Sequence, residues 1–362
     1  MGKYKKYLLP GFIFQSVTVG GGYGTGAEIK EFFASVGMQG GLMGMVITLV
    51  VWAVVAAFCL EFARMFHAYD YGTLMKKLLG KFAYLYDVCY WVMLLIVLGV
   101  VNATAGAMFT ELTGWSQWIG IIALNVWSIS LLLRGTEAIE DEYSFWSYAL
   151  YAVYAIFLIA TFSKFGAQIG AELAKAEVKP DWIMKGFQYS FYNLAQIPMF
   201  LYAARHIKTR DEAFIAGGLA GLIAIVPGSL LLLAMGADMA GVMAAKVPVL
   251  VVFKALDMKL LYYAFELVLF ATLVETDTGF IKAVLDRVQP VMKEKYTKTV
   301  ETSIIVVCSI IGICVSAFGL IGLIAKGYGT ICWGFFILFA VPVCTIGAYK
   351  IFQKPKNWEV ED

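Results

Sequence analysis

Charged residues are scarce in this sequence of 362 residues. Asp, Glu, Lys and Arg together make up 15% of it, whereas hydrophobic residues make up 61% and the mean hydropathy is +0.78. A soluble domain carries charge at about a quarter of its positions. Because so little charge cannot cover a water-exposed surface, the composition predicts an integral membrane protein surrounded by a lipid bilayer. The basic residues are scattered and leave a net charge of only +2, so no nucleic-acid partner is expected.

Residues typical of catalytic and metal sites are also few. The two histidines fall at expected helix ends, and the six cysteines lie in apolar runs without the paired spacing of a metal site. No Ser-His-Asp, H-E-x-x-H or paired-cysteine arrangement is visible. We therefore expect no enzyme, no cofactor and no resident metal. A channel is disfavoured as well, because no repeated ring of filter residues is visible.

Long apolar runs are abundant instead. A bilayer core about 30 Å thick requires roughly 20 apolar residues per helix. Ten segments meet this length, at about 8–36, 41–66, 82–110, 116–133, 143–164, 182–205, 211–236, 259–285, 302–325 and 328–352. Two shorter stretches, at 166–178 and 247–256, are expected to lie at the outer surface.

The distribution of Lys and Arg among the short loops predicts that both termini are cytoplasmic. An even number of helices with a loop after the fifth divides the chain into two sets of five that enter the membrane from opposite sides. This is the setting for an inverted repeat. We expect an all-α fold with a first repeat at 1–165, an outer loop with an amphipathic segment at 166–181, a second repeat at 182–353 and a cytoplasmic tail at 354–362.

The first helix of the first half is interrupted by the run "VGGGYGTGAEIKE". Glycine in a helix interior costs about 1 kcal/mol relative to alanine, so this cluster predicts a break. Gly22, Gly24 and Ala27 also fit the G-x-G-x-x-G/A spacing of a dinucleotide site. The uncharged apolar run at 41–60 that follows does not suit the alternating strands and helices of that fold, so we disfavour the nucleotide interpretation.

The first helix of the second half is interrupted at the matching place. Pro198 cannot donate to the carbonyl of Leu194 and predicts a break near 191–197. A polar patch that includes Tyr189, Tyr192 and Asn193 accompanies it. Paired interruptions of this kind are the best sequence indication of a transporter binding site.

The stretch "GFIFQSVTVGGGYGTGAEIKEFF" resembles the first helix of the YkvI-like bacterial membrane proteins, which belong to the amino acid-polyamine-organocation transporter superfamily. The ten-helix count, the cytoplasmic termini and the paired breaks are similar to the LeuT-type fold of that superfamily, with broken first and sixth helices. The resemblance implies ion-coupled symport of an amino acid or a related small solute across the cytoplasmic membrane. It implies neither which solute is taken up nor an oligomeric state. A receptor of the same fold that binds a solute without moving it is the alternative.

The predicted solute site lies at the two breaks, because non-helical backbone at membrane depth must be buried in protein or line a wet cavity. Amides near Gly26 suit a negative group such as a solute carboxylate. Thr25 and Glu28 have the spacing of a capping box, although Glu28 could instead meet a cationic solute group or carry a proton. The expected solute-binding residues are Gly21, Gly22, Tyr23, Gly24, Thr25, Gly26, Glu28, Tyr189, Tyr192 and Asn193.

The superfamily resemblance also implies a sodium site between the first break and hydroxyl groups of the eighth helix. Thr276 and Thr278 match the hydroxyl type, and Asp277 lies between them. At the first break, the carbonyls near Thr18 and Gly21 suit a cation, which completes the expected ion site. The carboxylate of Asp277 departs from the usual neutral pair and leaves both Na+ and H+ open as the coupling ion. Alternatively, Asp277 lies near the cytoplasmic end and caps a helix or pairs with a nearby basic residue (Arg205, Arg210 or Lys282).

Three further patterns predict where acidic, aromatic and paired side chains lie. Glu266 and Glu275 are charges at bilayer depth and are expected to face the protein interior. An aromatic cage for a quaternary ammonium could use Tyr23, Tyr189, Phe191, Tyr192 and Tyr263. Glu61 and Arg64, at i and i+3, are interpreted as a helix-surface ion pair at the inner boundary.

Overall fold

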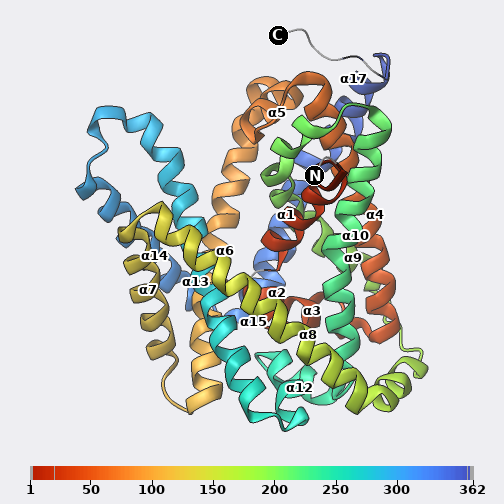
Figure 1. Ribbon diagram of the computed structural model, residues 1–362, viewed down its shortest axis with the longest axis vertical. Coiled ribbons are helices and arrows are strands. Elements are labelled where there is room, and N and C mark those ends of the chain that lie inside the picture. The colour runs from red at the N-terminus through yellow and green to blue at the C-terminus, as the bar shows by residue number, and fades with distance from the viewer. Residues whose placement is uncertain (1–2, 20, 357, 359–362) are drawn as a thin grey trace.

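The computed structural model describes residues 3–19, 21–356 and 358, and every regular element in these ranges is helical (Figure 1). Gly20, within the glycine run, and positions 357 and 359–362 of the expected tail lie outside the described residues. The predicted all-α class is confirmed for the described part of the chain. The helices form an elongated bundle, with α5 (Tyr71–Leu79) and α17 (Ala348–Phe352) at the same end (Figure 1).

Seven helical segments of the described chain are long and apolar enough to cross a membrane, which identifies a multi-pass membrane protein. They are Met38–Phe66, Tyr71–Thr113, Gln117–Arg134, Tyr148–Ala174, Arg210–Met235, Lys298–Ser316 and Leu320–Phe352. The principal helices within them are α4 (Met38–Phe66), α6 (Ala83–Thr113), α7 (Gln117–Arg134), α8 (Thr136–Ala174), α10 (Arg210–Met235), α14 (Lys298–Ser316) and α16 (Gly329–Phe335), the last flanked by π-helical turns such as η6 (Leu323–Tyr328).

The other three expected segments are the two with predicted breaks, at 8–36 and 182–205, and the acidic segment at 259–285. The first divides into α1 (Leu9–Thr18), α2 (Gly21–Gly24) and α3 (Ala27–Phe32). The second changes at its middle from α9 (Trp182–Asn193) to the 3-10 helix η4 (Leu194–His206), which contains Pro198. The third, α13 (Lys259–Met292), is long but carries three acidic residues in its apolar part. Both predicted breaks are therefore present.

The two shorter stretches are both helical. The stretch from 166 to 174 forms the end of α8, and a kink at the non-helical residue Phe165, with φ −116° and ψ 17°, separates it from the preceding long helix at the expected boundary. The stretch from 247 to 256 does form short α12 (Pro248–Leu256), preceded by α11 (Met239–Ala244). Pro248 suits the start of α12 because a first-turn amide has no helical acceptor.

Close packing of α4 against α10 and α9 supports the site. A Cβ atom added to Gly221 of α10 would lie 2.8 Å from the backbone nitrogen of Ala53, so the two helices approach closely because the residue is small. On the other side of α4, the Trp52 indole donates to the carbonyl of Ser190 at 3.0 Å. This bond ties α4 to α9 just before the second break.

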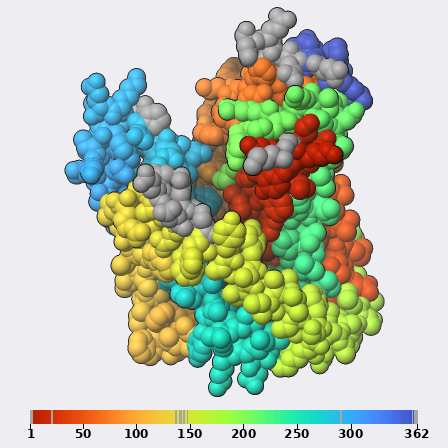
Figure 2. Space-filling model, viewed as in Figure 1, coloured from red at the N-terminus to blue at the C-terminus, as the bar shows by residue number. Residues whose placement is uncertain are grey.

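A larger hollow lies toward the end that carries α5. Figure 2 shows the molecule indented between the blue segment at upper left, which includes the start of α14, and the orange segment of α5 and α6. In this region α5, α6, η4 and α13 line a pocket of about 370 Å³. Its wall includes Ala195 and Pro198 of the second break, together with Arg287, whose guanidinium lies over the rings of Tyr71 and Tyr90.

Candidate functional site

The two breaks meet at a small cavity in the middle of the bundle. Its volume is about 30 Å³, which is room for one or two water molecules. The cavity is lined by Val17, Thr18, Gly22, Glu28, Met93, Val97, Val100, Val101, Tyr192, Asn193, Gln196, Thr276, Phe280 and Tyr328. Segments far apart in the sequence thus line one small cavity, whose wall carries both polar and apolar side chains.

A direct hydrogen bond joins the two breaks. Thr18, the last residue of α1, donates from its hydroxyl to the side-chain oxygen of Gln196 in η4 at 2.8 Å. The sequence placed Thr18 in the ion site and gave Gln196 no specific role. The partner could not be identified from the sequence, since 178 positions separate the two residues.

Glu28 faces the cavity and does not close a capping box, so that interpretation is wrong. The N-cap of α3 is Gly26, in the left-handed region at φ 78°, with no side-chain cap. The Thr25 hydroxyl donates to the carbonyl of Gly22 at 2.9 Å and also accepts from the amide of Ala27 at 3.3 Å, so Thr25 does satisfy one amide at the start of α3. The Glu28 carboxylate accepts a hydrogen bond from the Tyr192 hydroxyl across the break. A Cβ atom at Gly22 would collide with this carboxylate, which explains the glycine there.

The backbone of the first break is partly satisfied by hydrogen bonds from α8 and α12. The carbonyl of Gly24 accepts from the Tyr154 hydroxyl of α8 at 2.7 Å, and the carbonyl of Thr25 accepts from the amide of Val249 in α12 at 3.1 Å. A Cβ atom at Gly26 would lie 3.5 Å from Cβ of Pro248. Three predicted solute residues, Gly24, Thr25 and Gly26, therefore contact α8 and α12. Tyr154 was missed because a tyrosine within a long apolar helix carries no local signal.

The second break contributes Tyr192 and Asn193 to the cavity. The Asn193 amide donates to the carbonyl of Tyr189 at 3.0 Å, and the Tyr192 ring stacks on Tyr328 with centroids 4.5 Å apart. Tyr328 was not anticipated. The Tyr189 ring packs edge-on against the Tyr192 ring, with centroids 5.4 Å apart. In the first break, Gly21 is the first residue of α2.

The five aromatic residues of the expected cage do not gather at one point. Phe191 stacks on Phe336 at 4.5 Å and is not among the described residues of the cavity wall. Tyr263 is 60% exposed and lines a separate pocket with Lys254. Tyr23 packs toward Gly228 of α10, where a Cβ atom would lie 2.8 Å from the tyrosine hydroxyl.

The expected ion residues of α13 separate onto different faces. Thr276 lines the cavity, as does Thr18, and its hydroxyl donates to the carbonyl of Thr272 at 2.9 Å. Asp277 is absent from the described cavity wall and lies beside Ser128 of α7 instead. The Thr278 hydroxyl donates within its own helix to the carbonyl of Val274. The structure brings Thr18 and Thr276 together and directs Asp277 elsewhere.

The proposed cytoplasmic pairing of Asp277 is absent from the described ion pairs. Lys282 pairs with Asp286, Arg205 lies over the ring of Tyr69, and Arg210 bonds to Glu61. Glu266 lies next to Tyr262, which lines the same pocket as Tyr263, and Glu275 lies near Tyr151 of α8. The acidic residues of α13 therefore have different neighbours.

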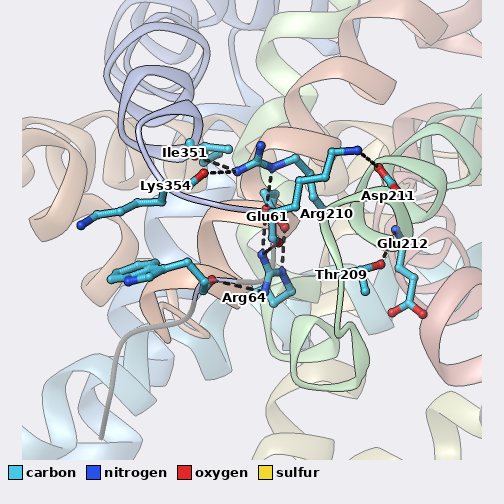
Figure 3. Close-up of polar contacts among 10 residues, drawn as sticks. Glu61, Arg64, Thr209, Arg210, Asp211, Glu212, Ile351 and Lys354 are labelled. Carbon is cyan, nitrogen blue, oxygen red and sulfur yellow. Dashed lines mark hydrogen bonds and ion pairs between the residues drawn. The ribbon is translucent and has the colours of Figure 1, made fainter.

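The Glu61 and Arg64 pair is buried, so its interpretation as a surface pair is wrong. Glu61 is 0% and Arg64 1% exposed, and their side chains form two hydrogen bonds of 2.8 Å each. Arg210 of α10 joins the same carboxylate at 3.1 Å (Figure 3). The two arginines also donate to main-chain carbonyls near the C-terminus, those of Ile351, Lys354, Lys356 and Trp358. This C-terminal network closes the end of the bundle that carries α5 and α17.

No cluster of three or more His, Cys, Asp or Glu side chains that could hold a metal occurs among the described residues. The polar groups at the solute cavity are one carboxylate, several hydroxyls and two side-chain amides. Such a set can bind a small polar solute through hydrogen bonds and one charge, and hydroxyl oxygens can contribute to a site for a hard cation.

Comparison with known proteins supports the fold. No protein-family model matches the chain. Over 211 residues the chain is 25% identical to the uncharacterized membrane protein YkvI of Bacillus subtilis (strain 168), and the match covers 58% of this chain and 60% of that protein. The chain therefore spans less than two thirds of the length of this relative.

Among solved structures, MhsT in complex with L-phenylalanine superposes with a TM-score of 0.59 at 15% identity, covering 95% of this chain and 97% of MhsT. A manganese transporter of Eremococcus coleocola gives a TM-score of 0.49 at 12% identity, with 94% and 85% covered. The likeness to MhsT confirms the predicted LeuT-type fold, and the match to YkvI confirms the resemblance drawn from the glycine run.

Proposed function

We propose that this multi-pass membrane protein is a secondary active transporter that takes up a small zwitterionic or carboxylate-bearing solute by ion-coupled alternating access. The observation that carries the proposal is the meeting of two interrupted helices at one small cavity, whose wall includes the buried Glu28 carboxylate. Interrupted membrane helices require partners for their free backbone groups, and binding sites near the bilayer midplane are built from them. The Thr18 to Gln196 bond links the two interruptions at this cavity.

The proposed topology has ten crossings in two inverted sets of five, with both termini in the cytoplasm and the protein in the cytoplasmic membrane. Seven apolar spans, two interrupted segments and acidic α13 supply the ten. The coverage of 95% of the chain by the superposition on MhsT supports this arrangement. The C-terminal network would then close the cytoplasmic end.

An amino acid-like solute suits the charges of the cavity. The Glu28 carboxylate offers a negative partner for an ammonium group, while the amide of Asn193 is a donor at the opposite break. MhsT itself was crystallised with L-phenylalanine, an amino acid with both charges. A cavity of about 30 Å³ is far below the roughly 300 Å³ or more typical of ligand pockets, so binding requires the two breaks to move apart. The 370 Å³ pocket is lined by Ala195 and Pro198 of the second break, so a movement of that break would bring the pocket and the cavity closer together.

Ion coupling is proposed at the hydroxyls that share the cavity, those of Thr18 and Thr276. Sodium there would lie within reach of both the first break and α13. If the coupling ion is a proton instead, Glu28 is the carboxylate at the cavity that would carry it. Uptake measurements distinguish sodium coupling from proton coupling, because only sodium-coupled uptake responds to a sodium gradient at constant pH.

Uptake into proteoliposomes tests the proposal. We expect radiolabelled amino acids, betaines or small carboxylates to accumulate above a protein-free control when a sodium or pH gradient is imposed. Asn193→Ala is expected to abolish uptake, whereas Ser303→Ala, on an exposed face of α14, is expected to retain it. Solute binding without accumulation in any gradient would identify a receptor, and wild-type uptake by Asn193→Ala would contradict the site.

A further inference from the structure

The pocket of about 370 Å³ at the end of the bundle that carries α5 contains a positive charge without an acidic partner. Arg287 of α13 lines this Arg287 pocket and takes part in no ion pair of the described ranges. Its guanidinium carbon lies 5.0 Å and 4.4 Å from the ring centroids of Tyr71 and Tyr90, which are also its side-chain hydrogen-bond partners. The guanidinium further donates to the carbonyl of Ala283 at 3.1 Å. These uncharged groups orient the guanidinium but leave its charge unbalanced, and it has more N–H donors than they occupy.

The acidic groups near the pocket do not supply the missing charge. Asp286 is the carboxylate of the described wall, and it pairs with Lys282 at 2.5 Å, so these two charges cancel. Asp87 lies near Tyr86 but is not among the described wall residues. The Arg287 pocket therefore keeps one net positive charge, which an anion can balance.

A hydroxyl without a partner accompanies this charge. Tyr86 of α6 also lines the pocket and is 1% exposed, and its hydroxyl has no hydrogen-bond partner among the described atoms. Tyr86 lies close enough to Arg287 to interact with its charge. Because a buried hydroxyl without a partner is unfavourable, an acceptor next to the guanidinium would satisfy both groups.

The remainder of the described wall suits an apolar body. Ala195, Pro198 and Met199 come from η4, at the second break. A volume of about 370 Å³ lies within the range of roughly 300–1,000 Å³ that is typical of small-molecule pockets. The planar guanidinium of an arginine matches a carboxylate, to which it can donate two parallel hydrogen bonds.

We propose that the Arg287 pocket binds a small organic monoanion, a carboxylate with an apolar body, through Arg287 and the Tyr86 hydroxyl. A doubly charged phosphate would exceed the single unbalanced charge of the wall. A cationic ligand is disfavoured, because Arg287 already lies over the rings of Tyr71 and Tyr90. The site is distinct from the solute cavity, since the two described walls share no residue.

Binding in this pocket has a consequence for the second break. The anion would contact η4 on one side and Arg287 of α13 on the other, and it would hold the two elements together. If the proposed function is correct, an occupied pocket slows the movement of η4 that uptake requires. This consequence rests on the proposed function, whereas the binding itself does not.

Thermal unfolding of the purified protein in detergent, with sodium benzoate as the probe, tests the assignment without any transport. At constant ionic strength and sodium concentration, we expect benzoate to raise the unfolding temperature, and uncharged benzamide and cationic benzylammonium to leave it unchanged. Arg287→Gln is expected to abolish the benzoate shift, and Tyr86→Phe to weaken the apparent benzoate affinity by about tenfold. Arg134→Gln, at an exposed arginine in the last turn of α7, is the matched control and is expected to keep the wild-type shift.

Four results would overturn the proposal. The first two are a wild-type protein without a benzoate-specific shift, and a full shift retained in both Arg287→Gln and Tyr86→Phe. The third is a shift lost in Asn193→Ala but kept in Arg287→Gln, which would place benzoate in the solute cavity. The fourth is a shift with inorganic phosphate or dihexanoylphosphatidylglycerol but none with benzoate, which would identify a phosphate or lipid-headgroup site. Tyr86→Phe keeps the test decisive if Arg287→Gln does not fold, and failure here leaves the proposed function standing.

Discussion

Replacing Glu61 by glutamine should strongly destabilise the protein. The substitution keeps the volume of the side chain and removes the negative charge that two arginines share through hydrogen bonds of 2.8, 2.8 and 3.1 Å (Figure 3). Arg64 is 1% exposed, so its charge would remain buried without its carboxylate partner. Breaking one member of a buried ion pair costs about 3–5 kcal/mol, and we expect a loss of that size.

The matched control is an exposed pair of the same region. Lys356 and Asp211 lie 3.3 Å apart with side chains 64% and 72% exposed, and such pairs contribute at most about 1 kcal/mol. The free energy of unfolding of Glu61→Gln and Asp211→Asn, measured by chemical denaturation in the same detergent, separates the two cases. If Glu61→Gln loses no more stability than Asp211→Asn, the burial argument for the C-terminal network is wrong.

Three further predictions follow from single contacts. Gly22→Ala should abolish uptake because a Cβ atom there collides with the cavity carboxylate, whereas Gly218→Ala, with open space around it, should retain uptake in the same assay. Tyr154→Phe should cost about 1–3 kcal/mol in unfolding free energy, since it removes the donor to a buried carbonyl; an unchanged stability would contradict this. Asp70 caps α5, and although partial burial raises its pKa, hydrogen bonds from Thr73 outweigh this and hold the pKa below its ordinary value of 3.8. Asp70→Ala should therefore lower stability by about 1 kcal/mol at neutral pH, and the difference from wild type should vanish as the pH falls below about 4.

The breaks could be predicted from the sequence because their causes are local. Clustered glycines destabilise a helix wherever it lies, and Pro198 removes a donor whatever packs around it. The same reasoning located Glu28, Tyr192 and Asn193 near one another, since paired interruptions in two halves imply a common site. Periodicity and length likewise predicted the apolar spans, which depend on the bilayer rather than on particular neighbours.

The partners across the bundle could not be predicted, because they come from distant segments. The T-x-x-E spacing of Thr25 and Glu28 favours a capping box, but the left-handed Gly26 takes the N-cap and Tyr192 supplies the hydrogen bond. The i, i+3 spacing of Glu61 and Arg64 is the same for an exposed and a buried pair. The Glu61 and Arg64 pair is buried because α10 and the C-terminal chain pack against it, and both come from distant parts of the sequence.

The separation of Thr276 from Asp277 could not be predicted from their spacing alone. Consecutive helical residues point about 100° apart, yet Tyr192 and Asn193 are also consecutive and both line the cavity. The packing of α13 against its neighbours decides which of the two side chains faces the cavity. The structure assigns Thr276 to the solute cavity and Asp277 to the junction with α7.

Among the described residues, the arginines of the C-terminal network bind the peptide oxygens of Ile351, Lys354 and Lys356. Every amino acid offers that oxygen, so a substitution at these three positions leaves the acceptors in place, whereas the path of the chain is constrained. Shortening the chain before position 354 would remove acceptors that no substitution removes, and a fusion partner joined beyond position 358 would leave them in place.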